Sequence, residues 1–248
     1  LNISPFGSSN PSKPVLSTTS SVAGDRRIYF QSYVDYMNKF GNHNVSGMLL
    51  WNIDQYDNNA PGNLVASLPR RKMGFAGRLS YDYDNRYMFE VNAGYNGSEN
   101  FAKGHKWGFF PSVAVGWNVS QENFFEPLKD VISNLKLRAS YGLVGNDQLL
   151  DSSGGLIRFI YMSDITLQSE NAGFTTGDKQ QITLNGPVYT RYQNNDLTWE
   201  VGEKLNVGFD MQLFNSLNVT VDAFREIRRD IFQQRYSIPN YLGTASTA

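Results

Sequence analysis

The sequence predicts an all-β fold, an antiparallel sheet whose strands are long enough to cross a membrane. Two patterns support this prediction: apolar and polar residues alternate with period two over long stretches, and short turns alternate with long connections. A third observation is the aromatic content of 14% in a chain of 248 residues whose hydrophobic residues total only 40%. Together these features are typical of a transmembrane β-barrel.

The clearest alternation lies in the first half of the chain. Apolar residues occupy every second position from Met73 to Tyr83, and again from Tyr87 to Tyr95. Between these stretches, Asp84-Asn85-Arg86 contains residues that readily form a tight turn. The two stretches are therefore expected to form a hairpin.

The same alternation predicts the remaining strands, for a total of about eight. These strands lie roughly at residues 28–40, 44–53, 109–120, 135–143, 204–213 and 217–223. Residues 121–133 form a short connection that could contain a helical turn. The predicted strands run to about 12 to 14 residues, longer than the roughly 5 to 6 of a typical globular strand. A tilted membrane strand needs about 9 to 11 residues, so these strands can cross a bilayer.

Aromatic residues are expected in two clusters, because barrels carry rings at both membrane interfaces. One cluster flanks a short turn and the other lies toward the long connections. They consist of Tyr81, Tyr83, Tyr87 and Phe89, and of Tyr95, Phe101 and Phe109, respectively.

We expect residues 1–248 to belong to one outer-membrane barrel domain. Its extracellular loops are expected at 1–26, 57–71, 97–106, 147–197 and 231–248.

Composition excludes several classes of function. With 22 Lys and Arg against 23 Asp and Glu, the chain lacks the basic character of a nucleic-acid-binding protein. The absence of cysteine excludes thiolate metal sites and cysteine nucleophiles. The two histidines, His43 and His105, lie in a short turn and a long loop, so a shared zinc site is not expected. The sequence contains no stretch of 18 consecutive apolar residues, so no transmembrane helix is predicted.

Catalysis, metals and cofactors are not expected. Asp82 and Glu90 could approach each other across the hairpin, as the two carboxylates of a glycosidase do, but ion pairs between strands are the more common arrangement. Asp54 and Asp57 could contact a surface cation, yet a solvated loop is favoured there.

The polar face of the strands is expected to line the lumen of the barrel. It offers charged and amide side chains, the groups that bind hydroxyl-rich solutes. The candidate substrate-binding residues are Arg78, Asp82, Glu90, Asn92, Asn96, Asn118 and Arg138.

Two other architectures fit the alternation. A secreted β-sandwich that binds carbohydrate through exposed rings would also place apolar residues on one face. An autonomous eight-stranded outer-membrane barrel is the second alternative. Side chains fill the interior of such a small barrel, and small residues such as Gly74, Ala76, Gly94 and Gly116 would pack it poorly.

Several ordered motifs resemble the SusC/RagA family of TonB-dependent outer-membrane transporters. They are GFFPSVAVGW at 108–117, SNLKLRASYG at 133–142 with Gly145-Asn146, and LTWE at 197–200 followed by EKLNVGFD at 203–210. The resemblance extends over roughly residues 26–243 in consistent order.

The resemblance implies a bacterial outer-membrane barrel of about 22 strands around an N-terminal plug, of which this chain supplies about eight strands. It also implies uptake of glycans or peptides, energised through TonB, together with a SusD-like surface lipoprotein. Residues 1–248 contain no recognisable plug, TonB-contacting segment or signal sequence. The plug is therefore expected to be absent, and contact with TonB is expected through an N-terminal region outside these residues. Outer-membrane lipids are the remaining expected partner, and no cofactor is implied.

Overall fold

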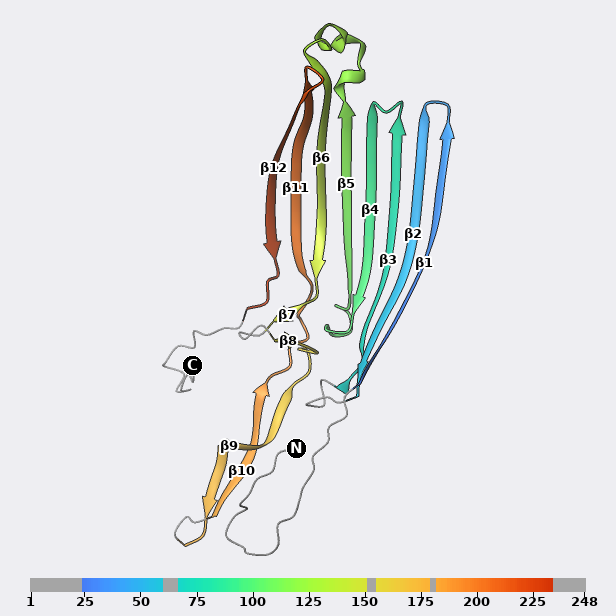
Figure 1. Ribbon diagram of the computed structural model, residues 1–248. Helices are drawn as coiled ribbons and strands as arrows, with labels where there is room; N and C mark the ends of the chain where they lie inside the picture. Colours follow the sequence, from blue (N-terminus) through green and yellow to red (C-terminus); the bar gives the residue numbers. More distant parts are fainter. Residues whose placement is uncertain (1–23, 60–66, 151–154, 179–181, 234–248) are drawn as a thin grey trace, which may run out of the picture.

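A computed structural model of the chain describes residues 24–59, 67–150, 155–178 and 182–233. Its main element is one eight-stranded sheet in the order β1-β2-β3-β4-β5-β6-β11-β12, with every neighbouring pair antiparallel (Figure 1). The strands are β1 (Asp25–Phe40), β2 (His43–Asn58), β3 (Arg70–Tyr83), β4 (Tyr87–Ser98), β5 (Trp107–Asn118), β6 (Ile132–Asn146), β11 (Glu200–Leu213) and β12 (Leu217–Arg229). The predicted all-β fold and the eight strands of the sheet are confirmed.

The connections alternate as the sequence predicts. The short ones lie at one end of the sheet, at the top of Figure 1, and the long ones lie at the other. Asp84 and Asn85 both have positive φ angles, of 54° and 53°. Two consecutive positive φ angles match the twist of a hairpin, and Asp and Asn tolerate them.

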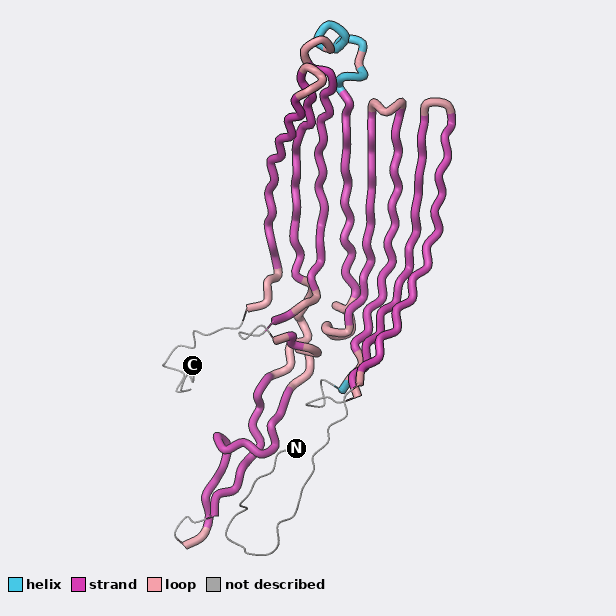
Figure 2. Tube along the Cα trace, in the orientation of Figure 1, coloured by secondary structure: helices cyan, strands magenta, loops and turns pink. Residues whose placement is uncertain are grey.

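The β5–β6 connection contains two short 3₁₀ helices, η1 (Val119–Gln121) and η2 (Asn123–Leu128), at the position where a helical turn is expected (Figure 2). Among the described residues, no helix has the length and apolar character needed to span a membrane.

The expectation of a loop over residues 147–197 misses two small sheets. One pairs β7 (Leu149–Leu150) with β8 (Leu156–Ile157), and the other pairs β9 (Asp164–Thr176) with β10 (Ile182–Arg191). The β9–β10 register shifts three times, between Leu184 and Arg191. Each shift interrupts the period-two pattern, which hides these strands from a reading based on alternation.

The register places the apolar positions of neighbouring strands side by side. Val91, for example, lies between Leu79 and Val113. We call this apolar side of the sheet the outer face and the opposite side the inner face. Among the described residues no second layer covers the outer face, since Leu49 is 72% exposed and Leu79 is 52% exposed. A sandwich would bury these side chains, so the sandwich alternative is wrong.

The sheet is also open. In the described part of the chain, β1 and β12 form its two edges and do not pair with each other. The alternative of a closed eight-stranded barrel is therefore wrong.

Aromatic rings form two bands on the outer face, as predicted. Toward the long connections, Trp51 stacks on Phe75 at 6.5 Å and Trp107 stacks on Tyr95 at 4.8 Å between ring centroids. Toward the short turns, Tyr83 stacks on Tyr87 at 6.4 Å, and Trp117 of β5 pairs with Tyr87 on the same face. Phe101 is an exception to the predicted cluster, because it is fully buried beneath the long connections rather than placed in the band.

The separation of the bands fits a bilayer. Trp107 and Trp117 are ten residues apart on β5. At about 3.3 Å per residue they lie about 33 Å apart along the strand, or about 23 Å along the membrane normal at a tilt of about 45°. The apolar band of outer-membrane barrels is about 25 Å tall.

Candidate functional site

The inner face carries networks of polar side chains, and three of the predicted site residues share one of them. Arg78 Nε on β3 donates a hydrogen bond to Asn92 Oδ1 on β4 at 3.0 Å. Asn92 Nδ2 in turn donates to Glu90 Oε1 at 2.8 Å, and Ser80 Oγ donates to Glu90 Oε2 at 3.1 Å. Arg78 Nε also lies 3.9 Å from Glu90. The cluster is held across one hairpin because all four positions face inward in register.

Arg138 belongs to a second network, on β6, β11 and β12. Its Nη2 lies 2.8 Å from Asp222 Oδ2 and 3.4 Å from Asp210 Oδ1. Thr220 Oγ1 donates to Asp210 Oδ1 at 3.0 Å. Sequence reasoning missed Asp210 and Asp222 as site residues. Their inward positions in the alternation were the available signal, whereas their convergence on Arg138 depends on register.

The other three candidates, Asp82, Asn96 and Asn118, lie outside these two networks. Asp82 accepts hydrogen bonds from Asn44 Nδ2 at 2.8 Å and from the backbone N–H of Asn85 at 3.1 Å, so it braces the turn. Asn118 Oδ1 accepts a hydrogen bond from Ser120 Oγ at 2.7 Å. Asn96 lies over Gly74, where an added Cβ would come within 2.5 Å of its Oδ1.

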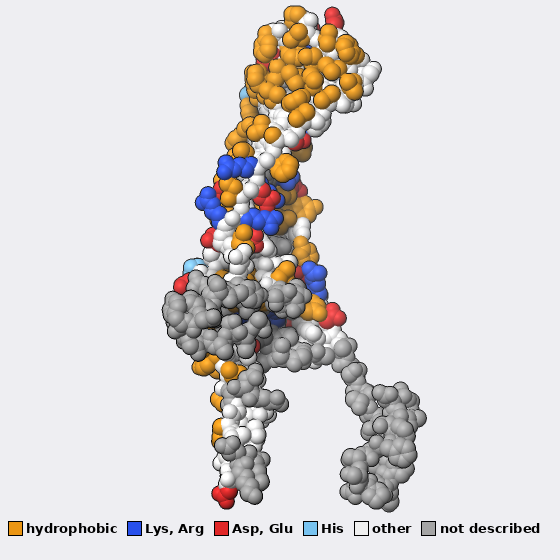
Figure 3. Space-filling view, turned by 90° about the vertical axis from the view of Figure 1, so that its left-hand side faces the viewer, with side chains coloured by type: hydrophobic (Ala, Val, Ile, Leu, Met, Phe, Trp, Pro, Cys, Tyr) orange, Lys and Arg blue, Asp and Glu red, His pale blue; other side chains and the backbone are white. Residues whose placement is uncertain are grey.

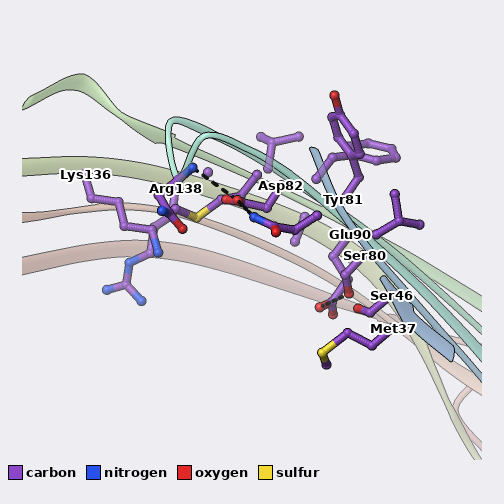
Figure 4. A pocket seen from close by; sticks show the side chains of 16 residues that line it. Met37, Ser46, Ser80, Tyr81, Asp82, Glu90, Lys136 and Arg138 are labelled. Carbon is purple, nitrogen blue, oxygen red and sulfur yellow. Dashed lines mark hydrogen bonds between the residues drawn. The ribbon is translucent and has the colours of Figure 1, made fainter. Parts of the chain in front are cut away.

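An open pocket of about 550 Å³ lies on the inner face, and three of the seven candidates line it: Asp82, Glu90 and Arg138. Figure 4 shows Lys136 and Arg138 on one side of the pocket and Ser80 and Glu90 on the other. The pocket thus offers hydrogen-bond donors and acceptors, together with both positively and negatively charged side chains. Arg78, Asn92, Asn96 and Asn118 lie outside its lining.

The long connections pack around a small hydrophobic core, which alternation alone does not reveal. Phe101, Leu149, Ile160 and Trp199 are buried there, and Phe110 packs against them. The ring centroid of Trp199 lies 5.4 Å from that of Phe101 and 5.3 Å from that of Phe110.

Close packing extends from this core to β6. A Cβ at Gly145 would clash with the Phe110 ring, which explains why a residue without a side chain stands there. Gly145 and Trp199 both belong to the motifs that resemble the SusC/RagA family. They therefore help to pack the long connections against the sheet.

A buried carboxylate ties the long connections to the strands. Asp147, which is 7% exposed, accepts a hydrogen bond from Ser98 Oγ at 2.8 Å and forms an ion pair with Lys72 Nζ at 2.8 Å. Asn100 Nδ2 donates to the backbone carbonyl of Asp147 at 2.9 Å. These contacts join β3, the β4–β5 connection and the start of the segment after β6.

Arg158 makes a second tie between connections. Its Nη1 and Nη2 donate to the backbone carbonyls of Leu68 and Pro69, each at 2.9 Å. Its guanidinium also lies over the Phe159 ring, 4.6 Å from the centroid. Burial, with the nearby charge of Arg70, lowers the pKa of Arg158, which nevertheless stays protonated because arginine ionises far above neutral pH.

The β9–β10 hairpin projects from this end of the sheet (Figure 1). It exposes large apolar side chains, including Leu167 at 73%. Tyr189 stacks on Tyr192 just beyond the hairpin, with 5.3 Å between centroids. Exposed rings and apolar side chains on an ordered hairpin are suited to binding another molecule.

The described residues contain no group of three or more His, Cys, Asp or Glu side chains able to hold a metal ion. His43 lies at the short-turn end, where its Nδ1 is 2.8 Å from the Tyr81 hydroxyl, and His105 lies in the β4–β5 connection at the other end. The two histidines therefore lie at opposite ends of the sheet. Asp54 pairs with Arg27 at 2.8 Å and Asp57 pairs with Arg26 at 3.0 Å.

These features define a section of an outer-membrane barrel with an apolar outer face and a polar inner face. The chain belongs to the family described as TonB dependent receptor-like, beta-barrel, which it matches over residues 4–247. Members of this family are transport proteins of the bacterial outer membrane and are not enzymes.

Curated relatives include TonB-dependent receptor P3 of Formosa agariphila, 29% identical over 241 residues, which cover 87% of this chain and 22% of the relative. TonB-dependent receptor SusC of Bacteroides thetaiotaomicron is 33% identical over 143 residues, covering 58% of this chain and 13% of the relative. The chain thus spans less than a quarter of the length of either protein.

Solved structures of the RagAB peptide importer share the fold. Its closed-closed state superposes with a TM-score of 0.67 at 18% identity, covering 90% of this chain and 25% of that chain. The sheet is therefore similar to one part of a larger barrel wall.

Proposed function

We propose that this chain forms part of the wall of a SusC/RagA-type importer, energised through TonB, that takes up glycans or peptides with a SusD-like surface lipoprotein. The observation that carries the proposal is the contrast between the two faces of one sheet in a member of this family. The outer face is apolar and edged by rings, whereas the inner face holds connected polar networks around Glu90 and Arg138. Such a wall can pass a polar solute while remaining stable in lipid.

The substrate contacts proposed for the inner face are the seven predicted residues. Arg78, Glu90 and Arg138 remain 54%, 39% and 38% exposed at their side chains, although each has a charged partner on the inner face. They can therefore exchange a protein partner for a ligand hydroxyl, amide or carboxylate. A mixture of charges suits a peptide or a sugar better than an apolar solute.

The long connections are proposed to be extracellular, at the boundaries given above, and to meet the lipoprotein. Short turns in barrels face the periplasm and longer loops face outward. The β9–β10 hairpin, with Tyr189 and Tyr192 at its base, offers the exposed surface for this contact. The solved RagAB structures of an importer in closed-closed and open-open states are consistent with a partnered assembly.

Uptake by the native bacterium tests the transport proposal. Cells lacking the receptor are expected to lose energy-dependent uptake of one class of fluorescent probe, either oligosaccharides or peptides, and to regain it with the intact receptor. Restoration with Arg78→Ala and Glu90→Ala is expected to be weaker. The matched control is Lys129→Ala, which removes a charge from the β5–β6 connection, where Lys129 pairs with Glu126 rather than with the inner-face networks. Unchanged uptake of both probe classes in the deletion strain would contradict the proposal.

Affinity purification from detergent-solubilised membranes tests the partner. The intact receptor is expected to retain a surface lipoprotein, and Tyr189→Ala with Tyr192→Ala is expected to retain less. Thr183→Ala, on an exposed position of β10, serves as the control. Loss of lipoprotein from the control and the double variant alike would argue against a role for the rings.

A further inference from the structure

The end of the sheet that carries the short turns displays an apolar surface that the proposed transport role does not explain. We call it the apolar foot, formed by Phe124, Leu128 and Val131 of the β5–β6 connection with Phe214 and Leu217 of the β11–β12 turn. Their exposed fractions are 64%, 50%, 48%, 64% and 55%. Figure 3 shows hydrophobic side chains gathered at this end of the molecule.

The foot is a built surface rather than a loose loop. Phe125, only 3% exposed, anchors the connection from within. The backbone N–H of Phe214 donates to the carbonyl of Val131 at 2.9 Å, and that of Asn215 donates to Ser133 Oγ at 3.0 Å. These bonds join the two segments, so their apolar side chains are displayed together.

The foot is continuous with the outer face. Glu122, between η1 and η2, accepts hydrogen bonds from the Tyr87 hydroxyl at 2.6 Å and from Trp117 Nε1 at 3.1 Å. Tyr87 and Trp117 belong to the ring band that marks the membrane interface, so Glu122 fastens the connection to that band. Leu217 extends the outer face from the other side, since it pairs with Leu213 at the end of β11.

We infer that the apolar foot lies in the periplasmic leaflet of the outer membrane, where it binds phospholipid at the boundary between headgroups and acyl chains. Amphipathic helices that lie in a membrane interface bury their apolar face about 5 to 10 Å into that boundary, and the exposed apolar side chains of the foot can do the same. Contiguous exposed apolar surface is otherwise unfavourable in water and marks an interaction site. The polar side of the segment supports this orientation, because Lys129 pairs with Glu126 at 2.6 Å and both remain exposed.

Fluorescence quenching in vesicles tests the inference on the intact receptor. Because residues 1–248 contain no cysteine, Phe124→Cys adds a unique labelling site within them for an environment-sensitive fluorophore. The receptor without the added cysteine gives the background. Leu49→Cys, on the outer face, is the lipid-exposed control, and Asn85→Cys, in the exposed β3–β4 turn, is the water-exposed control. Quenchers are phospholipids with a nitroxide near the headgroup or near the chain end, and aqueous iodide.

The inference predicts that the label at position 124 is quenched by the headgroup-proximal nitroxide more than by the deep one, and less by iodide than the label at position 85. Strong iodide quenching without lipid quenching would place the foot in water and overturn the inference. Protection from both lipid and iodide would show that protein covers the foot, which would overturn it as well. Resistance of each labelled receptor to unfolding in SDS without boiling confirms that the barrel is intact.

Discussion

Substitution of Val113 by arginine should destabilise the barrel by placing a charge at the middle of the membrane. Val113 lies on the outer face of β5, six residues after Trp107 and four before Trp117. It is 41% exposed and pairs with Val91 and Tyr141, so no polar contact is lost when it is replaced.

The magnitude follows from this depth. An arginine facing lipid at the bilayer midplane costs about 2 to 4 kcal/mol. At tenfold per 1.4 kcal/mol, the ratio of folded to unfolded receptor should fall by roughly 30- to 700-fold.

The neighbouring residue provides the matched control. Ala114 faces inward, pairs with Glu90 and Ser140, and lines the open pocket. Ala114→Arg therefore places the same charge at the same depth beside a carboxylate and water. Both variants would be made in the intact receptor and compared by urea titration in lipid vesicles, with SDS-resistant migration as the readout of folding.

Val113→Arg is expected to lower the urea midpoint, whereas Ala114→Arg should leave it close to that of the wild type. If the two variants were equally destabilised, or if Ala114→Arg were the worse of the two, the assignment of the faces would be refuted.

Three further predictions concern the connections. Trp199→Ala should lower the free energy of unfolding by about 3 to 5 kcal/mol, because Trp199 is buried in the small core, and should speed proteolysis within 147–197. Tyr192→Ala, at an exposed position, should do neither, and equal cleavage of the two variants would argue against this core. Asp147→Ala should cost about 2 kcal/mol, because Lys72 loses a charged partner, and should raise hydrogen exchange at the start of that segment; unchanged exchange would contradict the tie. Hydrogen bonds from the Tyr87 hydroxyl and then from Trp117, together with the charge of Arg86, lower the pKa of Glu122 below its usual 4.5. The contribution of Glu122 to stability is therefore present above that pH and is lost as pH falls through the lower pKa of the folded state. Thermal unfolding followed between about pH 6 and pH 3 should show a smaller acid loss in Glu122→Gln, and identical profiles would contradict the prediction.

Much of the sheet could be predicted because alternation is a local property. Successive side chains of a strand point to opposite faces, so the positions of Val91 and Asn92 on different faces follow from the chain itself. The turn at Asp84-Asn85 is local in the same way, since these residues tolerate positive φ angles. The strands β9 and β10 could not be predicted from local alternation, because register shifts interrupt the period-two pattern there.

The candidate site was predictable only as a list of inward-facing residues. Arg78, Glu90 and Asn92 meet because they lie on one hairpin with a short turn. The partners of Arg138 were not foreseen, since Asp222 is 84 residues away and reaches it only through the pairing of β6, β11 and β12.

The sequence by itself determined the eight strands of the main sheet, their two faces, the separation of short and long connections to opposite ends, and the family. The tertiary structure decided which polar residues meet, how Asp147 and Trp199 seat the long connections, and where the apolar foot stands. The physical reason is the range of the interactions. Strand periodicity and turn preference act between neighbours in the chain, whereas the bond from Ser98 to Asp147 spans 49 residues and that from Arg158 to Leu68 spans 90. Such contacts depend on register and on how the sheet curves, which no single stretch of sequence specifies.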